Sequence, residues 1–235
     1  MKKYLRKFKN YEYLTVLCIG DSTTSQEWAH PNWYDWLRFS FFQGGDWKRG
    51  PKMRKIFNNA HDGAPIDYFL KNFNRDVKKF KPDVVIVSFG WNDFRDLKMS
   101  FKIEALLNKI EKIEAEVIFW PPYGSLNKKI DQALAKTSRM CQRLVKKQGG
   151  VFIDMYKEFK KYDLSKIFTF KAWENTDWIM KAGQPDFIHC NEIGNQIIAE
   201  KIAREAFGIG LEEWGSQFGQ MTLANLKKYL KKRKY

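Results

Sequence analysis

The chain has 235 residues, of which 44% are hydrophobic and 29% charged, which is typical of a globular protein and excludes a disordered one. No apolar run approaches the roughly 18 residues of a membrane-spanning helix. Of the net charge of +15, +5 lies in residues 1–9, within a basic N-terminal lead (1–12), and +6 lies in residues 226–235, within a basic C-terminal extension (209–235). Because the charge belongs to the ends, we expect no specific nucleic-acid partner.

Five short runs rich in apolar and β-branched residues alternate with segments of helical periodicity. The runs predicted to form strands are, in chain order, Leu14–Ile19, Arg54–Phe57, Asp83–Phe89, Glu116–Trp120 and Val151–Asp154. Between and after them, apolar residues recur at helical spacing over 33–41, 66–80, 103–113, 130–144 and 193–206. This alternation predicts a parallel sheet covered by helices on both faces, a three-layer α/β/α sandwich.

Neither an internal repeat nor a change of composition divides the chain, so we expect a single domain over residues 1–235 with its core at about 13–207. Residues 157–185 are rich in aromatic side chains but lack clear periodicity, and we expect an ordered excursion over the sheet edge or the site. Residues 209–235 are predicted to form a loop and then a basic amphipathic helix.

Three cysteines, Cys18, Cys141 and Cys190, are too few and too scattered for a disulfide framework or a zinc site. The basic N-terminus lacks the apolar region and the small-residue cleavage site of a signal peptide. We therefore expect a cytoplasmic protein without a metal site.

Polar residues follow the predicted strands at the edge where open α/β sheets bind ligands. Ser22 follows the first strand in Gly-Asp-Ser-Thr-Thr, Gly63 lies after the second, and Asn92 lies in Gly-Trp-Asn-Asp after the third. Asp186 and His189 are three residues apart before the last helix, so one turn presents both. Each block alone is a weak signal because such residues are common in turns, but their joint order indicates one site.

Serine, histidine and aspartate together suit acyl transfer. A serine hydroxyl becomes a nucleophile when a base takes its proton, and histidine is the base suited to neutral pH. A carboxylate then orients the imidazole and stabilises its charged form. We predict Ser22 as the nucleophile, His189 as the base and Asp186 as its partner. The N–H groups of Ser22 and Gly63 and the side-chain amide of Asn92 are the predicted oxyanion donors.

Four neighbouring residues have two readings each. Trp91 is a candidate wall of the substrate pocket, although simple packing is nearly as common a role. His61 is a candidate substrate contact, although a loop histidine bonded to backbone is equally ordinary. Asp21 and Asp93 are expected to bond nearby backbone groups instead of taking part in catalysis.

The four blocks together resemble the SGNH/GDSL hydrolase family, in which Ser, Gly, Asn and His stand in four blocks in this order. The resemblance spans roughly residues 13–207. It implies a flavodoxin-like fold with a five-stranded parallel sheet, no cofactor and no metal, and ester or thioester hydrolysis through an acyl-serine. Thr23 replaces the Leu of the family's first motif, and Ala60 replaces a frequent Gly of the second, but neither position carries chemistry.

The expected substrate is a carboxylic ester of a small molecule or glycan, with an O-acetyl group on a carbohydrate preferred because no lipid-sized apolar insertion is evident. A lysophospholipase, thioesterase or acyltransferase on the same scaffold is the alternative within the enzyme class. A non-catalytic module that binds a glycan through residues 157–185 is the alternative outside it. A flavodoxin-like cofactor or receiver protein is a weaker one, because the first loop lacks a phosphate-binding pattern. The sequence predicts no oligomeric state.

Overall fold

The computed structural model describes residues 1–26, 31–43, 54–172, 175 and 180–211. Its strands are β1 (Leu14–Gly20), β2 (Arg54–Asn58), β3 (Val84–Ser88), β4 (Glu116–Trp120) and β5 (Val151–Phe152). They form one sheet in the order β2-β1-β3-β4-β5, and every neighbouring pair is parallel. The predicted parallel α/β architecture is therefore confirmed. The fifth strand ends early because the Asp154 side chain accepts a hydrogen bond from the Lys157 N–H and begins the next helix.

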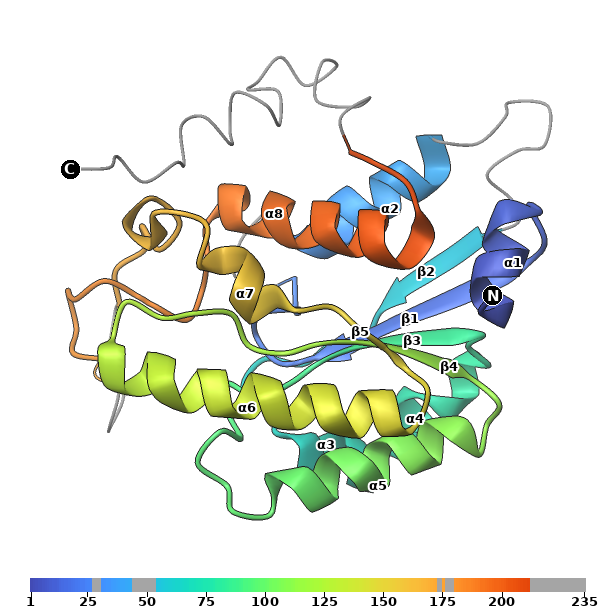
Figure 1. Ribbon diagram of the computed structural model, residues 1–235, viewed down its shortest axis with the longest axis horizontal. Coiled ribbons are helices and arrows are strands. Elements are labelled where there is room, and N and C mark those ends of the chain that lie inside the picture. Colours follow the sequence, from blue (N-terminus) through green and yellow to red (C-terminus); the bar gives the residue numbers. More distant parts are fainter. Residues whose placement is uncertain (27–30, 44–53, 173–174, 176–179, 212–235) are drawn as a thin grey trace.

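Helices cover both faces of the sheet (Figure 1). One face carries α1 (Lys3–Lys9), α2 (Trp33–Gln43), α7 (Met155–Phe159) and α8 (Glu192–Ile202), which continues into the π-helical turn η4 (Ala203–Phe207). The other face carries α3 (Ile66–Lys71), α4 (Phe73–Asp76), α5 (Met99–Glu111) and most of α6 (Lys128–Lys147). Two short 3-10 turns are η2 (Lys78–Phe80) and η3 (Leu164–Lys166).

The central strands β1 and β3 are buried along their whole length. Successive side chains enter opposite cores, so Val16 packs with α2 and α8 while Leu17 packs with α3 and α5. Burial on both faces is why these strands appear in the sequence as unbroken apolar runs. Their carboxyl ends meet at one edge and hold the loops that follow them in fixed positions.

Residues 66–80 do not form the single helix that their periodicity suggests. Helix α3 is followed by its cap residue Asn72, whose backbone N–H and side-chain amide both donate to the Tyr68 carbonyl, at 3.0 and 2.9 Å, so the side chain bonds back onto the helix end. The chain breaks again at Val77, which has a φ of −125°, before η2. Phe69, Phe73 and Val77 are nevertheless buried, so the apolar spacing still identifies the residues that face the core.

The N-terminal lead is also part of the packed structure. Tyr4 and Phe8 are four residues apart on α1, and both are buried in the core. The Tyr4 hydroxyl donates to the Ala206 carbonyl at 2.9 Å, which joins the first helix to the last turn. A basic segment therefore contributes an apolar face to the core, while Lys7 forms an ion pair with Asp83 at 2.6 Å.

Two predicted features fall partly outside the described residues. These are the helix of the C-terminal extension, from residue 212 onward, and residues 173–174 and 176–179 of the aromatic-rich segment. The described part of that segment contains an isolated antiparallel bridge between Lys171 and Pro185. None of the helices in the described part of the chain is both long and apolar enough to cross a membrane.

Helix α8 begins at a cap that generates a first prediction. Asn191 accepts the N–H groups of Ile193 and Gly194, and its amide donates to the Lys166 carbonyl at 2.9 Å and to the Thr169 hydroxyl at 3.2 Å. Asn191→Ala should lower the free energy of unfolding by about 2–3 kcal/mol, because it removes a cap and leaves buried groups unpaired.

The matched control is Asn127→Ala. Asn127 caps α6 through the N–H groups of Lys129 and Ile130, but it is exposed and holds no second segment. Its loss should cost only about 1 kcal/mol. Equal denaturant midpoints for the two variants would show that the bonds between Asn191 and residues 166–169 contribute nothing.

Candidate active site

A hydrogen-bond chain joins three of the predicted residues at the carboxyl edge of the sheet. The Ser22 Oγ lies 2.8 Å from His189 Nε2, and His189 Nδ1 lies 2.7 Å from Asp186 Oδ2. All three residues are buried, with exposed fractions of 8% or less. Ser22 and His189 are 167 positions apart in sequence, so the contact is made entirely by the tertiary fold.

The turn before α8 fixes the geometry of the Asp186–His189 pair. Asp186 Oδ1 accepts the backbone N–H groups of Ile188 at 2.8 Å and His189 at 3.0 Å, which leaves Oδ2 for the imidazole. Burial raises the pKa of Asp186, but the hydrogen bonds from His189 and from the two N–H groups outweigh burial and hold that pKa below its ordinary value. Asp186 is therefore a carboxylate at neutral pH, in the form that orients a histidine.

A tight turn after β1 holds Ser22. Its first residue, Gly20, has no room for a side chain, because a Cβ there would lie 2.6 Å from the Ser88 carbonyl oxygen. Asp21 Oδ1 then accepts the N–H and the hydroxyl of Thr23 at 3.0 and 2.7 Å, the backbone-bonding role expected for it. These contacts fix the direction of the intervening Ser22 side chain.

The loops after β1, β2 and β3 are tied to one another. The His61 N–H donates to the Gly20 carbonyl at 3.1 Å, and Asp93 Oδ1 accepts the Ile66 N–H at 3.1 Å. These bonds bring the predicted oxyanion donors to one place on the sheet edge, next to the switch in strand order between β1 and β3 where open α/β sheets bind ligands.

The predicted oxyanion donors are available for an acceptor. Within the described residues, the backbone N–H groups of Ser22 and Gly63 donate to no acceptor. Asn92 is exposed, and its amide makes only a long 3.5 Å contact to the Ala64 carbonyl. Gly63 has a φ of +64°, a left-handed conformation that favours glycine. Two backbone N–H groups without an acceptor and one weakly bonded side-chain amide are therefore available to a ligand.

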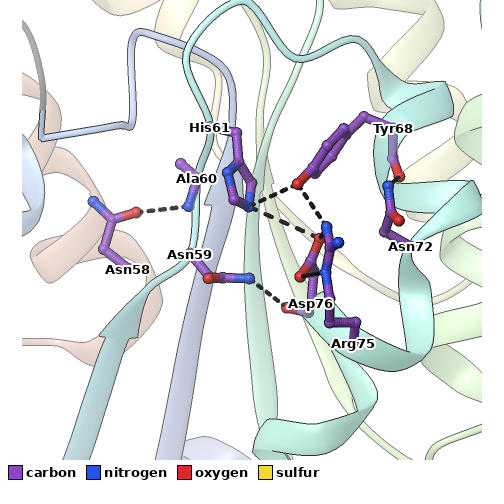
Figure 2. Close-up of polar contacts among 8 residues, drawn as sticks. All are labelled: Asn58, Asn59, Ala60, His61, Tyr68, Asn72, Arg75 and Asp76. Carbon is purple, nitrogen blue, oxygen red and sulfur yellow. Dashed lines mark hydrogen bonds and ion pairs between the residues drawn. The ribbon is translucent and has the colours of Figure 1, made fainter.

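The His61 side chain belongs to a different polar group (Figure 2). His61 Nε2 lies 3.4 Å from the Tyr68 hydroxyl and 3.9 Å from Asp76 Oδ2. Arg75 donates to both Asp76 carboxylate oxygens and to the Tyr68 hydroxyl, each at 2.7 Å. The ring is therefore held against α3 and α4, and it is the backbone of His61 that contacts the Ser22 turn.

Trp91 lies in the core. Only 3% of it is exposed, and its ring packs edge-on against Phe94 and Tyr123. Little of its surface is available to a substrate, so the packing role is the one that its position supports.

Tyr123 is a residue of the site that sequence reasoning missed. It follows the carboxyl end of β4, and its hydroxyl donates to the Ile188 carbonyl, which steadies the turn that carries His189. The signal was its place after the fourth strand, in Pro-Pro-Tyr. A cavity of about 10 Å³ beside Ser22 has seven residues on its walls, namely Ser22, Thr23, Asn32, Tyr123, His189, Cys190 and Asn195.

No group of three or more His, Cys, Asp or Glu side chains suited to a metal ion occurs in the part of the chain that the structure describes. The three cysteines are buried and unpaired. Burial raises the pKa of the Cys190 thiol, next to His189, to about 12, so it stays protonated at neutral pH.

Asp93 generates a prediction about pH. It is 2% exposed, its Oδ2 has no partner among the described residues, and burial raises its pKa from 3.8 to about 6. Because its pKa is higher in the folded protein than in the unfolded chain, Asp93 holds its proton more tightly when the protein is folded. The resulting contribution to the free energy of unfolding is fully present below about pH 4 and is lost as the pH rises through about 6. The loss is roughly 3 kcal/mol.

Asn cannot ionise, so Asp93→Asn should remove this loss. In chemical denaturation at pH 4 and pH 7, the wild-type protein should lose up to roughly 3 kcal/mol more stability than the variant over that interval. Parallel pH profiles for the two proteins would show that Asp93 is ionised without penalty.

Sequence and structure both show similarity to known proteins. The family model for the GDSL-like lipase/acylhydrolase family matches residues 18–197. No curated protein sequence shows a significant match to the chain. Among solved structures, Axe2, an acetylxylan esterase from Geobacillus stearothermophilus, is similar with a TM-score of 0.66 and 17% identity, over 85% of this chain and 96% of Axe2.

A second structure, LAE5, is described as an alpha/beta hydrolase enzyme from the metagenome of Lake Arreo in Spain. It has a TM-score of 0.64 and 18% identity, over 85% of this chain and 98% of LAE5. At such identities the structural likeness shows a shared fold, while the family match rests on the sequence itself. The chain belongs to the GDSL-like lipase/acylhydrolase family and is an ester-hydrolysing enzyme.

Proposed function

We propose that the chain hydrolyses carboxylic esters through an acyl-serine intermediate on Ser22. The observation that carries the proposal is the buried chain of hydrogen bonds from Asp186 through His189 to Ser22. A hydroxyl in contact with an imidazole, which is itself held by a carboxylate, is the arrangement that activates serine as a nucleophile.

In the first half of the reaction, His189 Nε2 takes the Ser22 proton as the oxygen attacks the acyl carbonyl. The resulting imidazolium is stabilised by the Asp186 carboxylate. When the tetrahedral intermediate collapses, His189 gives the proton to the leaving alcohol, and the acyl group stays on Ser22. Water then attacks the acyl-serine with His189 again as base, which releases the acid and restores the serine.

The oxyanion of each tetrahedral intermediate would accept hydrogen bonds from the N–H groups of Ser22 and Gly63 and from the Asn92 amide. These donors stabilise the transition state more than the ground state because the negative charge develops only during the reaction. That Asn92 is exposed supports this role, since its amide is accessible to a bound ester.

A small acyl group, such as an acetyl on a carbohydrate, is the substrate that we favour. The described cavity beside Ser22 is only about 10 Å³, which is about one water molecule and too small for an alkyl chain. Axe2, one of the solved structures of similar fold, is named an acetylxylan esterase, which is consistent with this preference.

The nucleophile is tested by Ser22→Ala, with Ser25→Ala as the matched control. Ser25 is equally buried three residues away, and its Oγ has no hydrogen-bond partner among the described residues. On p-nitrophenyl esters of rising chain length, Ser22→Ala should abolish turnover, while Ser25→Ala should keep it within about twofold, since removing a hydroxyl that makes no hydrogen bond costs little. Full activity in Ser22→Ala would refute the assignment.

The oxyanion role is tested by Asn92→Ala. Loss of one such donor should lower kcat by about 10²–10³-fold with little change in KM, because the bond strengthens only in the transition state. Melting temperature should hardly change, because Asn92 is exposed and makes one long contact. A kcat within a few-fold of wild type would remove Asn92 from the mechanism.

A further inference from the structure

The edge of the sheet that carries Ser22 also carries large apolar side chains in contact with solvent. We call Leu97, Phe101, Leu126 and Phe170 the apolar rim; their exposed fractions are 97%, 72%, 42% and 37%. In the described residues, the other large apolar side chains this exposed are Met1 and Tyr13, at the chain start and before β1. Clustered apolar exposure of this kind marks an interaction surface.

Topology brings the rim together. Leu97 and Phe101 lie where α5 begins after β3, Leu126 lies just before α6 after β4, and Phe170 lies in the connection that follows β5. β3 and β4 are neighbours, and neighbouring strands lie about 4.8 Å apart, so the connections that carry Leu97, Phe101 and Leu126 leave the same edge side by side. Phe170 lies beyond α7 and η3, and the hydrogen bond from the Asp186 N–H to its carbonyl places it at this edge. This edge is on the left of Figure 1, where α5 and α6 begin.

The rim adjoins the catalytic residues directly. The Asp186 N–H donates to the Phe170 carbonyl at 2.8 Å, so the strand segment that presents Phe170 is bonded to the turn that holds His189. Asn92, the exposed oxyanion donor, begins the connection that ends at Leu97 and Phe101. A surface that covers the rim therefore meets the opening of the site.

Each part of the rim is accompanied by exposed lysine. Lys98 follows Leu97, Lys128 and Lys129 follow Leu126, and Lys171 follows Phe170. None of these four ammonium groups forms an ion pair within the residues that the structure describes. The nearby carboxylates Asp67 and Asp96, by contrast, are both bonded by Lys102. The rim thus combines aliphatic and aromatic side chains with unneutralised positive charge.

We propose that the apolar rim docks the catalytic edge onto an anionic lipid surface. Apolar side chains enter the acyl boundary of such a surface while lysine stems lie along it and place their ammonium groups among anionic headgroups. A neutral glycan offers no partner for the lysines, and two aliphatic leucines give it no stacking surface. A second copy of this chain would set the same lysines against one another. Charge complementarity therefore selects the anionic lipid.

The test uses the full chain carrying Ser22→Ala, so that vesicle binding is measured without turnover and independently of the proposed reaction. Co-sedimentation with vesicles of phosphatidylcholine alone and with 30% phosphatidylglycerol, a composition in the usual range of about a third anionic lipid, gives the partition coefficient. We expect binding to the anionic vesicles and at least about tenfold weaker binding to the neutral ones.

The basic chain ends also attract anionic vesicles, so matched variants isolate the rim. Leu97→Ser with Phe101→Ser should lower the partition coefficient by about tenfold or more, whereas Tyr13→Ser, at the opposite edge of the sheet, should leave it within about twofold. The same contrast is expected for charge. Changing Lys98, Lys128 and Lys171 to Gln should weaken binding strongly, and changing Lys78, Lys112 and Lys146, exposed at the opposite edge, should weaken it little.

Equal losses in the rim and control variants would overturn the proposal, because the chain ends alone would then account for binding. So would absence of binding to anionic vesicles, or a dimer in light scattering that the rim variants dissociate. The Leu97 and Phe101 variant, with Ser22 intact, should keep its melting temperature and its kcat/KM on a soluble short-chain ester. Loss of esterase activity in Ser22→Ala is scored separately, so failure of either proposal is distinguishable from failure of the other.

Discussion

The hydrogen bond between Asp186 and His189 is the interaction on which the site depends. Asp186 stays ionised in a buried place because it accepts two backbone N–H groups as well as the imidazole. The ionised carboxylate fixes which ring nitrogen of His189 carries the proton and leaves Nε2 to accept from Ser22. Without that charge the imidazole would lose its orientation, and Ser22 would lose the base that we propose for it.

The rest of the fold brings Ser22 and His189 together. Ser22 is fixed by the end of a fully buried strand, β1, and by a turn whose first residue leaves no room for a side chain. His189 is fixed by its short turn, by the hydrogen bond from the Tyr123 hydroxyl to the Ile188 carbonyl in that turn, and by the Asn191 cap at the start of α8. Rigidity at both ends is what keeps two residues far apart in sequence at 2.8 Å.

The parallel sheet and the Ser22–His189–Asp186 contact were predictable from sequence, because buried strands appear as apolar runs and functional loops follow them in order. Features set by tertiary contact were not. Apolar spacing predicts which positions of 66–80 face the core, but not the break at Asn72, whose side chain bonds back to the Tyr68 carbonyl. The helical spacing over 103–113 leaves Phe101 unassigned and does not indicate that this side chain faces solvent. The contact between the His61 ring and the Asp76 carboxylate likewise could not be predicted from sequence.

The central claim is that the acyl group passes through Ser22, and it is tested most directly by trapping that species. Wild-type protein would be quenched in acid during turnover of p-nitrophenyl acetate, digested and analysed by mass spectrometry. The account predicts one acetyl group on the peptide that contains Ser22, together with a burst of p-nitrophenol no larger than one equivalent per protein molecule. Rapid turnover with the acetyl group on another residue would contradict the account. Release of product without any modification of the Ser22 peptide, in wild-type protein and in Asp186→Asn alike, would contradict it too.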